Sequence, residues 1–317
     1  MVTNYILFIH GVNTRNTREK PTYADKLFDL IQKNVSSSIP LKKVALYWGD
    51  VTLQQEKELR EGFKQSKSWN KLWFKDFREK QLLQFVGDAA LYLSRHVGSL
   101  AVEQLTQQAK QGLEGYQPGD CLHLVTHSWG TVILFDVLFA NRWNDPEIPG
   151  YKSVQEIREG IFGLLPDSKH GIPLASVHTM GSPIALFSLI SIIGKDRQGS
   201  THDISPGLKE LLKNLHEHGI QLPWQNYIHP GDPIAWPLEK LIPSLVDECQ
   251  KFINIEDVIT PGSGPLDFLG KMVQKTFLAL VNGGNAHGSY LKSKEVAKKI
   301  AQTIQESANQ LNVYFET

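Results

Sequence analysis

The sequence predicts an α/β protein with a mostly parallel central sheet and helices on both of its faces. Short apolar runs of strand length alternate with segments of helical periodicity, a pattern typical of parallel strands joined by helices. The runs are almost continuously apolar, as expected of strands covered on both faces. Polar turns containing His, Ser or Asp follow three of these runs, so chemically active side chains are expected where strands end.

The first predicted strand covers residues 5–9, YILFI, and ends at His10 and Gly11. A helix is expected from Pro21 to about Val35, because its apolar residues have helical spacing and proline suits a first helical turn. The stretch KKVALYWGD predicts a second buried strand. Residues 53–115 contain no proline and are dense in Gln, Lys, Glu, Leu and aromatics. They predict two or three helices inserted before the next strand.

The alternation then resumes with a strand at 121–127 and a helix from Trp129 to Asn141. A strand at 174–180 and a helix in PIALFSLISII follow, with a short helical piece within 195–222. The segments WQNYIHPGDPIAW and KFINIEDVIT predict two more strands. A helical stretch near 266–281 and a long polar helix complete the chain.

Charge and cysteine content exclude several classes of function. Lys and Arg together number 33, as do Asp and Glu, so no nucleic-acid partner is expected. Cys121 and Cys249 lie far apart without metal-ligand spacing, which indicates neither a disulfide framework nor a zinc site. His216 and His218 face different directions on a helix, so we expect a solvated helix end there and no metal pair.

The same composition favours a soluble protein of a reducing compartment, and we expect a cytoplasmic location. The first residues, MVTNYILFIHG, lack the basic flank and the small-residue cleavage site of a signal peptide. No segment reaches the roughly 18 uncharged apolar residues needed to span a bilayer.

The stretch VTHSWGT, residues 125–131, contains Ser128 between a predicted strand and a predicted helix. A nucleophile elbow needs a buried strand, a serine on a sharp turn, small neighbours and a helix that stabilises oxyanion charge. Gly130 fits this pattern, whereas Thr126 occupies the position usually held by glycine. The alternative is that Ser128 only caps the helix, since serine is a preferred N-cap residue.

Acyl transfer at Ser128 would need two backbone N–H donors for the oxyanion. The residue after the nucleophile supplies one, which is Trp129. The second is expected from a loop after an earlier strand, and FIHGVN offers the N–H of Val12 beside Gly11, where glycine permits close approach. Taken alone, His10-Gly11 would be an ordinary turn at the end of a strand.

A serine hydroxyl is a weak nucleophile unless a histidine accepts its proton and a carboxylate holds that histidine. The expected chain order is Ser, then acid, then His. His287, in the glycine-flanked loop GGNAHGSY, is the candidate base. Asp232 follows a predicted strand in YIHPGDPIAW and is the candidate acid, with Asp247 and Asp257 as alternatives.

With these motifs, most of the chain resembles the α/β-hydrolase superfamily, particularly its lipase-like members. FIHGVN, THSWGTVILFDVL, TMGSPIAL, IHPGDPIAWPL and AHGSYL carry the resemblance in that order. The third and fourth are similar to stretches of class-three lipases. The elbow is similar to that of glycosylphosphatidylinositol-deacylase-like and intracellular phospholipase-like serine hydrolases. The resemblance implies an α/β-hydrolase fold with Ser128 as nucleophile, Asp232 as acid, His287 as base, and Val12 and Trp129 as oxyanion donors.

On this basis we expect one domain over residues 1–317, with residues 53–115 as a helical cap. The aromatic side chains of the cap could line an acyl pocket, contact a lipid surface or simply pack onto the core. They are Trp69, Trp73, Phe74, Phe77, Phe85 and Tyr92.

The expected function is hydrolysis of a carboxylic ester, from a small molecule or a lipid, through an acyl-enzyme that needs no metal or organic cofactor. An acyltransferase or a thioesterase could use the same residues. An alternative of another class is a catalytically silent interaction module, in which Thr126 distorts the elbow.

Overall fold

The computed structural model describes residues 2–12, 14–73, 75, 79, 92, 95–164, 171–186, 203–249, 251–260 and 286–315. In these ranges the strands form one six-stranded sheet in the order β2-β1-β3-β4-β5-β6, and every neighbouring pair is parallel. The strands are β1 (Asn4–Ile9), β2 (Leu41–Leu46), β3 (Cys121–His127), β4 (Leu174–Met180), β5 (Leu222–Ile228) and β6 (Ile253–Ile259). Each corresponds to a predicted strand, and the predicted parallel sheet is confirmed.

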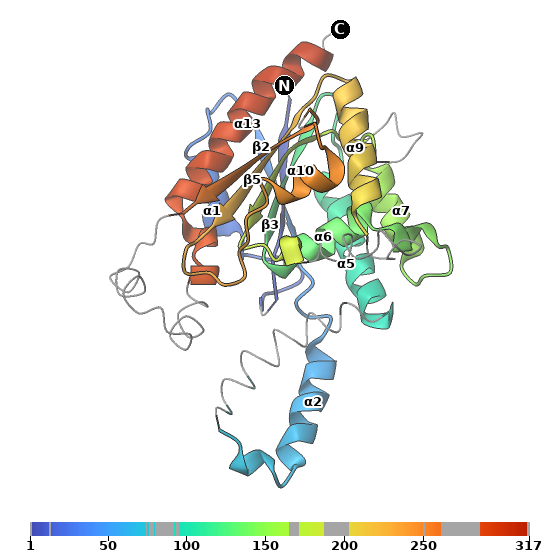
Figure 1. Cartoon of the computed structure of the whole chain (residues 1–317), viewed down its shortest axis with the longest axis vertical. Helices are drawn as coiled ribbons and strands as arrows, with labels where there is room; N and C mark the ends of the chain where they lie inside the picture. The colour runs from blue at the N-terminus through green and yellow to red at the C-terminus, as the bar shows by residue number, and fades with distance from the viewer. Residues whose placement is uncertain are drawn as a thin grey trace.

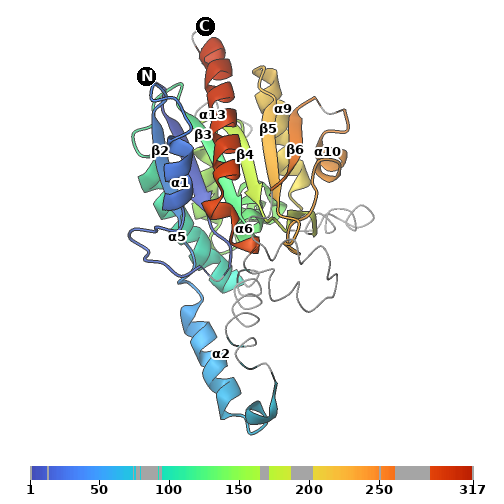
Figure 2. The ribbon, with the colours of Figure 1, turned by 90° about the vertical axis from the view of Figure 1, so that its left-hand side faces the viewer.

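Helices cover both faces of this sheet, as Figures 1 and 2 show. One face carries α1 (Asp25–Gln32) and α13 (Lys294–Phe315). The other carries α5 (Arg95–Leu113), α6 (Trp129–Phe139), α7 (Tyr151–Glu159) and α9 (Ser205–Glu217). The short α10 (Leu241–Val246) lies beside α9. The helices α7 and α10 are not among those expected from the sequence, whereas α1, α6, α9 and α13 are.

Strand β1 shows why its sequence is apolar at every position. Ile6 and Phe8 belong to the core cluster under α1 and α13, whereas Leu7 and Ile9 belong to the cluster under the opposite helices. Because successive side chains of a strand point to opposite faces, a strand covered on both sides buries all of them. The continuous apolar runs in the sequence therefore reflect a three-layer arrangement.

The range 53–115 contains two different kinds of helix. Helix α2 (Leu53–Gln65) and the 3-10 turn η1 (Trp69–Lys71) project beyond the carboxyl edge of the sheet (Figures 1 and 2). Helix α5 instead packs on the sheet and buries Val102 and Leu105 in the core. Its position is that of a crossover helix leading into β3, so the core of the domain includes the end of the expected insertion. The role of the remainder as a cap stays a prediction.

The aromatic side chains of this range have different environments. Trp69 stacks on Phe63 with ring centroids 6.1 Å apart, and Trp73 is 79% exposed. Tyr92 is buried and donates a hydrogen bond of 2.8 Å to Asp136, so it packs in the core. Phe74, Phe77 and Phe85 lie outside the described residues, as does the helix expected near 266–281.

Within the described ranges, no helix combines the length and apolar character required to cross a bilayer.

Candidate active site

Ser128 occupies the turn between β3 and α6 in a strained conformation. Its φ of 54° and ψ of −131° make it the one non-glycine residue with a positive φ in the described part of the chain. Such a conformation costs about 1–3 kcal/mol and persists only where the surrounding structure imposes it. Ser128 occupies the N-cap position of α6, but its side chain makes no capping hydrogen bond to the helix. Its buried Oγ has no hydrogen-bond partner among the described residues.

The neighbours of Ser128 allow β3, α6 and β1 to approach closely. A methyl group added at Gly130 would lie 2.4 Å from the carbonyl oxygen of His10, so only glycine fits there. Thr126 is fully buried, and its hydroxyl lies 2.8 Å from the hydroxyl of Thr131 in α6. The side chain that replaces the usual glycine is therefore accommodated by a hydrogen bond to the helix behind it.

Gly11, which follows β1, lies directly against the Ser128 turn. An added methyl group would be 2.4 Å from Cβ and 2.9 Å from Oγ of Ser128. The His10 ring fixes the orientation of the next peptide, because its Nδ1 donates a 2.6 Å hydrogen bond to the Gly11 carbonyl while its Nε2 accepts the N–H of Trp48. In a trans peptide the N–H points opposite to the carbonyl. The N–H of Val12 therefore points away from the His10 ring.

Asp232 and His287 form a hydrogen-bonded pair, with Oδ2 of Asp232 2.9 Å from Nδ1 of His287. The carboxylate also accepts the N–H of Ile234 at 3.0 Å and the hydroxyl of Tyr290 at 2.8 Å. Burial acts to raise the pKa of Asp232, but these hydrogen bonds and the charge of the imidazole outweigh it, so the pKa is lowered. An ionised carboxylate only accepts hydrogen bonds, so Nδ1 of His287 carries the proton. In the neutral ring Nε2 is then unprotonated.

His127, Met180 and Gly181 connect this pair to the Ser128 turn. Nε2 of His127 donates a 2.7 Å hydrogen bond to the backbone carbonyl of His287, and the two rings lie 4.8 Å apart. Met180 accepts the Ser128 N–H at 2.9 Å, and a methyl group added at the next residue, Gly181, would lie 3.0 Å from Nδ1 of His287. The Ser128 turn and His287 are thus linked through neighbouring residues, and no hydrogen bond joins Oγ of Ser128 to Nε2 of His287. Nε2 of His287, like the serine Oγ, is buried without a partner among the described residues.

The side chains of His127 and Tyr290 are both neutral, because burial disfavours their charged forms. Burial, with a smaller contribution from His287, lowers the pKa of His127 to about 3, so this ring stays an N–H donor. Burial and the nearby Asp232 raise the pKa of Tyr290, whose hydroxyl accepts the N–H of His229 at 2.8 Å while it donates to Asp232. Both groups orient the Asp232–His287 pair without adding charge.

The structure also places the other candidates. Asp247 accepts the backbone N–H groups of residues 251–253, and Asp257 accepts those of residues 238 and 239, so each holds a loop and neither contacts His287. His216 and His218 lie exposed at the end of α9, which confirms a solvated helix end. Sequence reasoning missed the positioning contacts of His127 and Tyr290. Both residues lie inside the motifs THSWG and AHGSYL, but their contacts are not readable from one sequence.

No cluster of three or more His, Cys, Asp or Glu side chains in the described ranges could hold a metal ion. No protein-family model matches the chain, and no curated protein sequence matches it. The fold is an α/β sheet flanked by helices, and the interpretation of the site therefore depends on its geometry and chemistry.

Proposed function

We propose that the protein is a serine hydrolase of the α/β-hydrolase type that cleaves carboxylic esters through an acyl-enzyme. The supporting observation is the strained Ser128 turn beside the Asp232–His287 pair. Nucleophilic serine chemistry requires three groups together: a serine hydroxyl, a base with an unprotonated nitrogen and a carboxylate that orients the base. Each of the three residues follows a different strand, and the parallel sheet gathers them at its carboxyl edge.

In the proposed reaction, Nε2 of His287 takes the proton of Ser128 as Oγ attacks the ester carbonyl carbon. The tetrahedral intermediate collapses when His287 gives that proton to the leaving alkoxide, which leaves as an alcohol. Water then attacks the acyl carbon while His287 takes its proton. The second tetrahedral intermediate breaks its bond to Oγ of Ser128, which takes the proton back from His287, and the carboxylic acid is released. Asp232 stabilises the imidazolium of His287 during both acylation and deacylation.

The oxyanion would be stabilised by backbone N–H groups on both sides of Ser128. Trp129 begins α6, so its N–H lies at the positive end of the helix dipole. Val12 N–H belongs to the peptide that the His10 ring orients next to Ser128. Because such donors are already in place before the reaction, they stabilise developing charge without reorganisation. A silent interaction module was the alternative in which Thr126 distorts the turn at Ser128. The hydrogen bond between the Thr126 and Thr131 hydroxyls accommodates the Thr126 side chain, which favours an active enzyme over that alternative.

The proposal is tested by hydrolysis of p-nitrophenyl esters from acetyl to palmitoyl. Ser128→Ala and His287→Ala should each lower kcat/KM by roughly 10³-fold or more, because the residues of such a triad act as a unit. His216→Ala is the matched control, since this histidine is exposed on α9 and should leave activity unchanged. A fluorophosphonate should label the wild type at Ser128 and fail to label Ser128→Ala.

Absence of both ester hydrolysis and labelling in folded wild-type protein would refute the proposal. Equal activity of the wild type and Ser128→Ala would assign the hydrolysis to another group. Circular dichroism and thermal unfolding of each variant separate loss of chemistry from loss of fold.

A further inference from the structure

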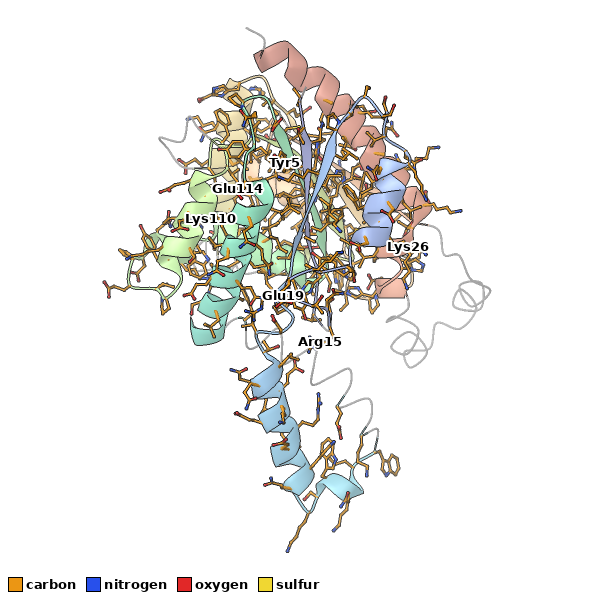
Figure 3. All side chains as sticks on the ribbon, turned by 180° about the vertical axis from the view of Figure 1, so that it is seen from behind. Tyr5, Arg15, Glu19, Lys26, Lys110 and Glu114 are labelled. Carbon is orange, nitrogen blue, oxygen red and sulfur yellow. The ribbon has the colours of Figure 1, made fainter. Side chains whose placement is uncertain are left out.

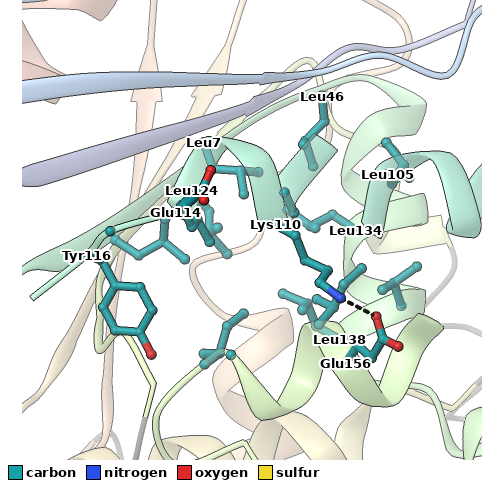
Figure 4. A pocket seen from close by; sticks show the side chains of 18 residues that line it. Leu7, Leu46, Leu105, Lys110, Glu114, Tyr116, Leu124, Leu134, Leu138 and Glu156 are labelled. Atoms are coloured by element: carbon teal, nitrogen blue, oxygen red, sulfur yellow. Dashed lines mark hydrogen bonds and ion pairs between the residues drawn. The ribbon is translucent and has the colours of Figure 1, made fainter. Parts of the chain in front are cut away.

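An apolar cavity of about 320 Å³ lies between the sheet and helices α5, α6 and α7 (Figure 4). Leucine side chains of three strands form its floor, and they are Leu7, Leu46, Leu122 and Leu124. The walls come mainly from apolar side chains of the three helices. Protein interiors normally pack as densely as organic crystals, with few voids larger than a water molecule. A partly open space of this size above a set of leucines can accept an apolar ligand.

The volume suits a small apolar ligand. An engineered apolar cavity of roughly 150 Å³ already stays dry and binds benzene. Ligand pockets span roughly 300–1,000 Å³, so this cavity falls at the lower end of that range. Ala109 of α5 lines the cavity and is buried, and its small side chain leaves space that a larger residue would fill.

The cavity opens away from Ser128. Among its polar lining residues, Lys110, Glu114 and Tyr116 come from the end of α5 and the loop that leads into β3, and Glu156 comes from α7. Ser128 lies after the other end of that strand, and none of Ser128, Asp232 and His287 lines the cavity. Figure 3 shows Lys110, in α5, and Glu114, just after this helix, well away from Arg15, which lies near the carboxyl edge. The cavity and the proposed active site are therefore separate sites.

An ion pair joins the two helices at the rim of the cavity. Nζ of Lys110 lies 3.0 Å from Oε2 of Glu156 in α7, as the dashed line in Figure 4 shows. Both side chains are largely in solvent, with exposed fractions of 64% and 49%. Exposed ion pairs contribute little to stability, so a ligand can displace this contact at small cost.

We propose that this cavity binds an uncharged aliphatic chain, with a terminal hydroxyl at the rim. The interior offers hydrocarbon contacts, and a charged group placed there would lose its hydration without compensation. At the rim, the ammonium of Lys110 pairs with Glu156, and the ammonium of Lys42 donates a 3.2 Å hydrogen bond to the Glu114 carbonyl. Both cations are already engaged, so neither is left to bind a fatty-acid carboxylate. A fatty alcohol meets both conditions. This inference does not depend on the proposed hydrolase function.

The test is calorimetric titration of the protein with 1-octanol and, separately, with octanoate at pH 8. The wild type should bind 1-octanol at least tenfold more tightly than octanoate. Ala109→Phe should weaken octanol binding at least tenfold, because the ring occupies the cavity. Gln107→Phe places the same side chain on the exposed side of α5 and should bind octanol as the wild type does.

Two further variants keep the test decisive. Ile157→Trp narrows the rim at a half-buried position and should also weaken octanol binding if Ala109→Phe fails to fold. Ser128→Ala should leave octanol binding unchanged, whereas loss of binding in this variant would place the alcohol in the proposed active site and overturn the inference. Absence of binding to the wild type, equal binding by the filled variants, or octanoate binding as tightly as octanol would each overturn it as well.

Discussion

His287 is held from three sides by groups that do not themselves react. Asp232 holds its Nδ1, His127 holds its backbone carbonyl, and Gly181 leaves room for the ring by having no side chain. Tyr290 in turn bonds Asp232 and the backbone of His229. In the proposed reaction the base must be placed to within a fraction of an ångström of the proton that it accepts, so these contacts are expected to affect the rate.

At the residue scale, His127→Phe should lower kcat for ester hydrolysis by about 10–100-fold while KM changes little. The phenyl ring retains the packing against His287 but lacks the N–H that bonds its carbonyl, and small displacements of a catalytic group have effects of this size. His127→Gln, whose amide can donate the same bond, should restore part of the rate.

The pH profile of kcat/KM provides an independent readout for this contact, because the apparent pKa of the base should differ between His127→Phe and the wild type. Unchanged kcat in His127→Phe, or no recovery in His127→Gln, would show that the contact does not position the base.

At the scale of elements, the start of α6 depends on its close approach to β1. Gly130 is the contact point, since any side chain there would meet the carbonyl oxygens of His10 and Ile9 at 2.4 and 2.9 Å. His10 O also accepts the indole N–H of Trp48, so β1, β2 and α6 are tied together at this point. The elbow is therefore a product of three elements and not of its own sequence motif alone.

Gly130→Ala should accordingly destabilise the protein by about 1–3 kcal/mol, the usual cost of overpacking, and should abolish most of the activity. Gly62→Ala in α2 is the matched control, because an added methyl group there meets nothing within 4 Å. This helical position should gain up to about 1 kcal/mol from the better helix propensity of alanine. Urea unfolding monitored by circular dichroism measures both changes, and equal effects of the two substitutions would contradict the packing argument.

At the scale of the whole molecule, buried neutral histidines make the free energy of unfolding depend on pH. Burial is the largest cause that lowers the pKa of His123, His127 and His178 to about 3. His123 and His178 both bond Ser176, at 2.7 and 2.9 Å, in a polar row within the sheet. In the unfolded chain a histidine titrates near 6.5, so below that pH the unfolded state binds more protons.

The free energy of unfolding should therefore fall as pH decreases from about 6.5 towards 3, by up to about 1.4 kcal/mol per pH unit for each buried histidine. Urea unfolding at pH 5, 6, 7 and 8 measures this slope. His178→Gln should reduce it by one proton equivalent, whereas His216→Gln, which changes an exposed side chain, should not. A midpoint that is independent of pH below 6.5 would contradict the assignment of these rings as neutral.

The strands could be predicted from the sequence because each is a local apolar run bounded by polar turns. Ser128, Asp232 and His287 could be nominated for the same reason, since each lies in a short loop next to such a run. The chain order Ser, acid, His selected Asp232 and His287 as a pair, and the hydrogen bond between these two residues agrees with that pairing.

What the tertiary structure alone decided are the contacts between distant segments. The strand order β2-β1-β3-β4-β5-β6 brings His127 to the carbonyl of a residue 160 positions later. It also places α5 over the core, although α5 belongs to the same predicted insertion as the projecting α2. The Ser128 conformation and the cavity under α5 also result from packing between elements. Local periodicity determines which segments become strands and helices, whereas the register and layering of the sheet determine which side chains meet.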